Sequence, residues 1–119
     1  NIQKAKEAAA KDSLRILRTA IEAYAAKNNG IPPGYPNNDT SLSPSVMAFT
    51  LQLTTGNAYL QKMPKNTFNG MTGLRIFIDA APFPTEADGA SGWMYKPATK
   101  EIRLNWTGTD SEGIDYFEY

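Results

Sequence analysis

Cysteine and histidine are both absent from the 119 residues of this chain. Their absence excludes disulfide bridges, thiolate nucleophiles, the usual zinc sites and acid–base catalysis by histidine. The sequence also contains no apolar run long enough to cross a bilayer and no secretory leader. It begins at Asn1 within a helical pattern, so we expect it to be a piece of a longer protein.

Net charge is absent as well, because 12 basic and 12 acidic residues cancel at pH 7. A nucleic-acid partner is therefore not supported, since such proteins normally carry a basic patch. Lysine and arginine nevertheless crowd the beginning of the chain, and acidic residues crowd its end. The basic beginning suits an anionic lipid or an acidic neighbouring subunit, and the alternative is a solvated helix face.

The composition predicts one folded domain over residues 1–119. Hydrophobic residues make up 41% of the chain and aromatic residues 11%, which is enough for a single core. We expect a long helix within 1–30, a loop and a short helix within 31–72, and an antiparallel sheet with a C-terminal loop within 73–119. Because helices and strands are segregated along the chain, the predicted fold class is α+β.

Residues 2–27 have the pattern of one amphipathic helix. Its apolar side chains recur at intervals of three and four and so share one stripe: Ala10, Leu14, Leu17, Ile21 and Tyr24. Residues 28–30, Asn-Asn-Gly, supply a left-handed C-terminal stop, and Pro32 prevents continuation. The stripe fades before Lys6, so we expect the first turns to project from the globular part and to remain free for partner helices.

Shorter elements are predicted for the rest of the chain. A turn-rich tract is followed by Ser43 as N-cap and Pro44 as first residue of a short helix that ends before Gly56. Apolar and polar residues alternate or cluster as in strands at 74–78, 93–96 and 102–106. The connection 97–100 is short, which predicts a hairpin of the last two strands.

Four segments carry a resemblance to a known family. They are the alanine-rich helix with its Asn-Asn-Gly exit, the stretch Tyr-Leu-Gln-Lys-Met-Pro-Lys-Asn at 59–66, the stretch Gly-Trp-Met-Tyr-Lys-Pro-Ala-Thr at 92–99, and the acidic loop at 107–115. In this order they resemble the type IV pilin-like proteins, and most closely the major pseudopilins of type II secretion. Lys100 stands where that family's hairpin has glycine, and an aromatic tail, Tyr116–Tyr119, follows the acidic loop.

The resemblance implies a pilin-like fold whose missing upstream half-helix anchors it in the bacterial inner membrane, with this domain in the periplasm. It implies a structural subunit that polymerises with its own copies and with other pseudopilins. The family's fibre is built on an inner-membrane assembly platform and helps to export folded proteins. Our candidates for contacts with partner helices are Lys4, Lys6, Glu7 and Lys11.

A calcium site in the acidic C-terminal loop is the second implication of the resemblance. Carried over by position, Thr107 would supply a backbone carbonyl and Asp110 and Asp115 would supply carboxylates. Calcium takes six to eight oxygen ligands, and a tight acidic turn with free carbonyls is one way to provide them. The alternative is a solvated turn in which Asp110 makes a local Asx-type hydrogen bond.

Other classes of function remain open beside the pseudopilin hypothesis. A pilin of another assembly system is one alternative, and a periplasmic module that binds a ligand through exposed aromatics is another. An enzyme is not favoured, because Ser91 lies in no nucleophile motif and has no histidine to activate it. For Trp93, Tyr95 and Trp106 we expect core packing against the long helix rather than ligand stacking.

Overall fold

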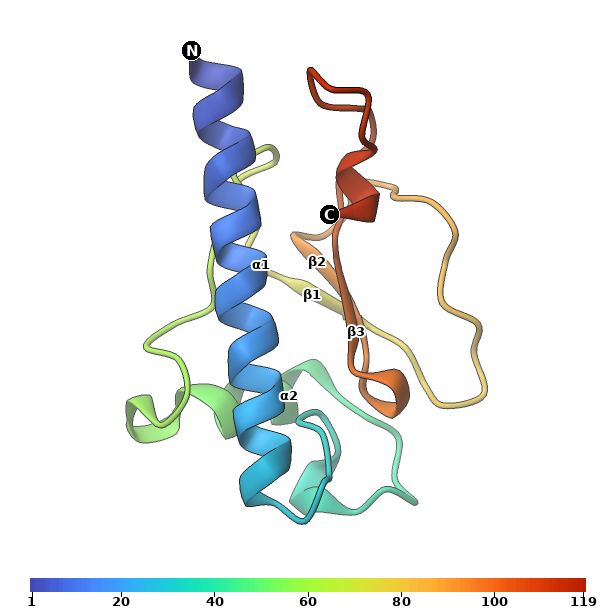
Figure 1. Ribbon diagram of the computed structural model, residues 1–119. Coiled ribbons are helices and arrows are strands. Elements are labelled where there is room, and N and C mark those ends of the chain that lie inside the picture. The colour runs from blue at the N-terminus through green and yellow to red at the C-terminus, as the bar shows by residue number, and fades with distance from the viewer.

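The computed structural model describes residues 1–119 as an α+β domain (Figure 1). One long helix, α1, runs beside a small three-stranded sheet, and a short helix, α2, lies across the end of α1 where the chain leaves it. The fold class is therefore confirmed. The layout is consistent with a pilin-like arrangement, and its sheet differs from the prediction in one respect described below.

Helix α1 spans Ile2–Lys27, as the spacing of its apolar residues predicts. The side chain of Asn1 caps the helix by accepting a hydrogen bond from the backbone N–H of Lys4. At its other end Asn29 and Gly30 have positive φ, and Gly30 donates its N–H to the carbonyl of Ala25. All five residues of the predicted stripe are buried.

Helix α2 spans Val46–Thr54 and begins two residues later than predicted. The cap is Ser45, whose side chain accepts from the backbone N–H of Ala48. The prediction of Ser43 and Pro44 was therefore wrong in register. Both sites offer a serine, and the buried Phe49 and Leu53 belong to the helix with either cap, so the local pattern does not distinguish them.

The sheet is mixed, which corrects the antiparallel sheet of the prediction. Its strands are β1, Leu74–Ile76, β2, Trp93–Lys96, and β3, Glu101–Leu104, in that spatial order. The hairpin of β2 and β3 is confirmed as antiparallel, but β1 pairs with β2 in parallel. Parallel strands need a crossover of about a dozen residues or more, and the connection 77–92 supplies one.

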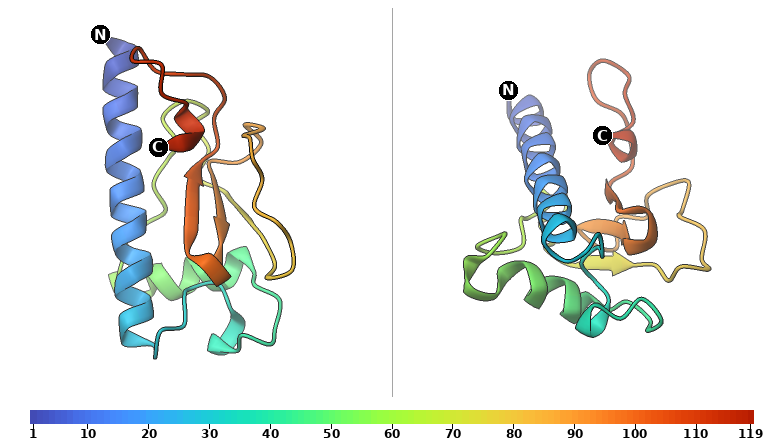
Figure 2. Two further views of the ribbon diagram at one scale, coloured as in Figure 1. Left: turned by 45° about the vertical axis from the view of Figure 1, so that its right-hand side comes forward. Right: turned by 60° about the horizontal axis from the view of Figure 1, so that its bottom comes forward.

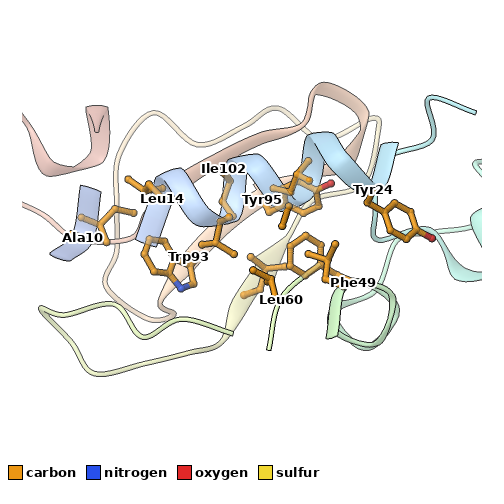
Figure 3. Close-up of a cluster of buried hydrophobic side chains, with 14 of the residues drawn as sticks. Ala10, Leu14, Tyr24, Phe49, Leu60, Trp93, Tyr95 and Ile102 are labelled. Carbon is orange, nitrogen blue, oxygen red and sulfur yellow. The ribbon is translucent and has the colours of Figure 1, made fainter. Parts of the chain in front are cut away.

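The core lies between the sheet and the two helices (Figure 3). Trp93 and Tyr95 of β2 and Ile102 of β3 face α1 and are at most 1% exposed. The predicted packing role of Trp93 and Tyr95 is confirmed, and the partly buried Trp106 stacks on Phe68. A smaller cluster on the opposite face of the sheet contains three residues: Phe77, Met94 and Phe117.

Buried amides hold the loops at the end of β3. The side-chain oxygen of Asn105 accepts the backbone N–H groups of Asp88 and Gly89, and its amide donates to Asp88 and Ser91. Asn66 donates to the carbonyl of Gly92 at 2.9 Å. Both asparagines are completely buried, so this network joins three loops that are distant in sequence.

Candidate functional site

The first turns of α1 are packed against the C-terminal segment, which we define as residues 107–119. Both lie at the same end of the molecule (Figure 1 and Figure 2), and a hollow lies between the first turns of α1 and residues 110–112 of the C-terminal segment. The hydroxyl of Tyr116 donates to the Glu7 carboxylate at 2.7 Å, and the amide of Gln3 donates to both groups. The expectation that these turns project freely was therefore wrong on this side of the helix.

Two cations of α1 hold the end of the chain. The Arg18 guanidinium donates to the carbonyls of Tyr119 and Ile102, both at 3.1 Å. Burial beside Arg103 lowers the pKa of Arg18 from its ordinary value. The Lys11 ammonium lies 4.7 Å from the centre of the Tyr119 ring, a cation–π geometry. The C-terminal segment is thus fixed to α1 over about four helical turns.

Asp110 organises the acidic loop. One of its oxygens accepts the backbone N–H groups of Glu112 and Ile114, and the other accepts the hydroxyl of Tyr119 at 2.9 Å. These donors favour the ionised carboxylate, so the pKa of Asp110 lies below its usual value, with the bond from Ile114 as the largest cause. Burial and the bond to Asp110 raise the pKa of Tyr119.

The three predicted calcium ligands are divided between two hollows. Asp110 lines one of about 300 Å³ against Lys4, Glu7 and Lys11 of α1. Thr107 and Asp115 line another of about 180 Å³. The acidic side chains of the molecule form no cluster of three around one point.

The donor set therefore does not fit a calcium shell as it is arranged. Both Asp110 oxygens are occupied by protein donors, which matches the alternative of a local Asx-type turn. We derive no step through calcium, and the calcium site stays a prediction.

The four predicted partner contacts occupy different environments. Lys4, Lys6 and Lys11 are exposed, although Lys11 also covers the Tyr119 ring. Glu7 is only 7% exposed and already accepts from Gln3 and Tyr116, which fits a role within the subunit better than a contact between subunits. The three lysines remain candidates for contacts with a partner.

The outer side of α1 carries a second stripe that the sequence analysis did not identify. Its positions recur at intervals of three and four along the whole helix, and every one is exposed: Ile2, Ala5, Ala9, Asp12, Ile16, Thr19 and Ala23. Ile2 is 77% and Ile16 37% exposed. Such spacing is the seam pattern of helices that pack side by side, here interrupted by one charge and one hydroxyl.

The contacts of the C-terminal tyrosines were also missed. A signal for them exists in the sequence, because Gln3, Glu7 and Lys11 are spaced by four and so lie on one face of α1. Nothing in the sequence alone pairs that face with Tyr116 or Tyr119, since the contact joins positions more than a hundred residues apart.

The chain matches no protein-family model, no curated protein and no solved structure. No helix of the structure combines the length and the apolar character needed to cross a membrane.

Proposed function

We propose that this chain is the globular part of a pilin-like structural subunit, most similar to a pseudopilin of type II secretion. The observation that carries the proposal is α1 itself. It has 26 residues, about 39 Å at 1.5 Å per residue, in a molecule whose longest dimension is 43 Å. One side of α1 packs against the core, and the other side carries the exposed outer stripe.

The proposed mechanism is polymerisation through the outer stripe of α1. The stripe presents apolar and small side chains to solvent along the helix, apart from Asp12 and Thr19, and burying them against another helix is favourable. Copies related by a head-to-tail contact form an open filament rather than a closed pair. Lys4 and Lys6 at the basic end would meet acidic groups of a neighbour, which sets register more than affinity.

The partners and location follow from this proposal. They are further copies of the chain, other pseudopilins, and an assembly platform at the bacterial inner membrane. An upstream helix of about 20 apolar residues would anchor the subunit, with this domain in the periplasm. The role is mechanical rather than catalytic, and export of folded proteins is the process served. A pilin of a pilus or uptake system would share the same fold and seam.

The coding region directly upstream of Asn1 provides the first test. We expect a short basic leader and about 20 apolar residues. A soluble domain at that position would contradict the polymer mechanism.

Disulfide trapping provides the second test, because residues 1–119 contain no cysteine that would compete with introduced ones. In the full-length chain, the pair Ile2→Cys and Ile16→Cys should give a ladder of covalent oligomers under oxidation. The two positions are about 21 Å apart along one helix, too far for a bridge within a subunit. The matched control pairs Ile2→Cys with Ala80→Cys, an exposed loop position. Dimers alone, or equal ladders in both variants, would count against the seam.

A further inference from the structure

The connection from β1 to β2, residues 77–92, covers the far face of the sheet. It runs on the side of the sheet away from α1 (Figure 1 and Figure 2). The buried cluster of Phe77, Met94 and Phe117 lies on that face, and three side chains of the connection pack against it: Ala81, Phe83 and Ala87. This cluster is therefore kept from water by a segment that contains no helix or strand.

Two points of the connection are tied to the rest of the fold. At the first, the hydroxyl of Tyr35 donates to the Asp79 carboxylate at 2.6 Å. At the second, the backbone N–H of Asp88 donates to the buried Asn105 at 3.0 Å. We define the strap as residues 80–87, which lie between these two points. Both ties are outside the strap, so they can act as hinges while the strap itself moves.

The strap itself has few contacts with the sheet. No main-chain N–H or carbonyl group of residues 82–87 makes a hydrogen bond within the chain. The single hydrogen bond from the sheet to the strap is donated by the Lys96 ammonium of β2 to the carbonyl of Ala81, at 2.7 Å. The other contacts are apolar and come chiefly from the partly buried Phe83 and Ala87. One lysine and one aromatic ring thus hold the strap closed.

We propose that the strap opens between its two hinges while α1, α2 and the sheet stay folded. Opening breaks the bond from Lys96 and withdraws Phe83, and it uncovers Phe77, Met94 and Phe117 as an apolar surface. Segments with few buried contacts and few main-chain hydrogen bonds open locally at a fraction of the free energy of global unfolding. The strap does not contact α1, and its opening is independent of the proposed polymerisation.

Oxidation of Met94 tests this opening in the unaltered chain, because Met94 is only 1% exposed. Dilute hydrogen peroxide transfers one oxygen atom to the thioether sulfur and leaves as water, and peptide mass spectrometry detects the sulfoxide. Met94 should react more slowly than the exposed Met47, but at least about tenfold faster than the unfolded fraction from urea denaturation allows. Its rate should hardly change up to about 1 M urea, because a local opening exposes little surface. A rate set by global unfolding, with the urea dependence of global unfolding, would overturn the proposal.

Matched variants assign the opening to the strap. Lys96→Leu removes the donor to Ala81 and should raise the oxidation rate of Met94 about fivefold, the effect of one hydrogen bond of ordinary net strength. Lys65→Leu, at an exposed position outside the connection, should leave the rate unchanged. Tyr119→Phe loosens the C-terminal segment, which supplies Phe117 to the cluster, and should also leave it unchanged.

Two results with these variants would contradict the strap. An unchanged rate in Lys96→Leu would show that peroxide reaches Met94 without release of the strap. An acceleration by Tyr119→Phe as large as that by Lys96→Leu would assign the opening to the C-terminal segment. Either result would overturn the proposal.

Discussion

At the scale of single residues, Asn105 is a buried polar group whose side chain makes hydrogen bonds to Asp88, Gly89 and Ser91. Replacing it by alanine removes acceptors from the backbone N–H groups of Asp88 and Gly89 and leaves a small void at the end of β3. We expect Asn105→Ala to lower the free energy of unfolding by about 2 kcal/mol, measured by urea denaturation. Lys65→Ala, at an exposed position next to Asn66, serves as control and should stay within about 0.5 kcal/mol.

The titration of Asp110 gives a prediction about acid stability. Its pKa is depressed in the folded chain, above all by the N–H of Ile114. Its contribution is therefore complete above the unfolded value of about 3.9 and is lost as the pH falls through the lower folded value. Stability should decline below about pH 4. Asp110→Asn, which cannot titrate, should show a shallower decline in urea unfolding between pH 5 and pH 2; equal slopes would contradict this role.

Some residue-level features were predictable, and others were not. The buried stripe of α1 followed from spacing alone, because a helix surrounded on one side by a core imposes a period of 3.6 on its sequence. Asn66 and Asn105 carried no such signal. Their burial depends on loops that meet only in the folded chain. The sequence around each asparagine therefore looks like that of an ordinary turn.

At the scale of elements, the crossing of residues 71–73 over the start of β2 requires glycine at position 92. A Cβ there would lie 2.3 Å from the carbonyl oxygen of Met71, which is backbone and has no rotamer to move away. We expect Gly92→Ala to cost about 3 kcal/mol or more and to reduce soluble yield.

Gly73→Ala is the matched control for that crossing. A Cβ at Gly73 meets no heavy atom within 4 Å, and its φ is not in the left-handed region. The melting temperature of the Gly73→Ala variant should therefore equal or slightly exceed that of the wild type. Equal melting temperatures of the two variants would contradict this requirement and show that the backbone shifts to accept a methyl group at position 92.

The local sequence pattern could not predict the direction in which β1 runs in the sheet. The β2–β3 hairpin was predicted from a short connection, which permits only an antiparallel return. A connection of the length of 77–92 permits either direction, and the choice lies in contacts such as Phe77, Phe83 and Phe117 packing on the far face of the sheet. The cap of α2 was misplaced for the same reason, since two serines satisfy the local rule equally well.

At the scale of the whole molecule, α1 connects the core, the C-terminal segment and the exposed outer stripe. Its inner face carries the core, one flank holds the C-terminal segment through Glu7, Lys11 and Arg18, and its outer side presents the exposed seam. The C-terminal segment therefore stiffens the very turns of α1 that the proposed polymer would use. The predicted partner and metal residues lie at opposite ends of the sequence, so neither the meeting of Asp110 with Lys4, Glu7 and Lys11 nor the contacts around it could be predicted.

Because the C-terminal segment is held by α1, the effect of calcium on stability can be tested on the intact domain. The loop is closed by Asp110 through two backbone N–H groups and by Tyr119, so the fold does not require a cation to hold it. We expect the melting temperature to be the same in chelator and in millimolar calcium, measured by circular dichroism. Tyr119→Phe should lower it by a few degrees in both conditions, because it removes a hydrogen bond to a carboxylate. Ligand binding to the folded state alone raises stability with concentration, so a calcium-dependent rise that Asp115→Asn abolishes would restore the metal site and show that the loop rearranges to bind it.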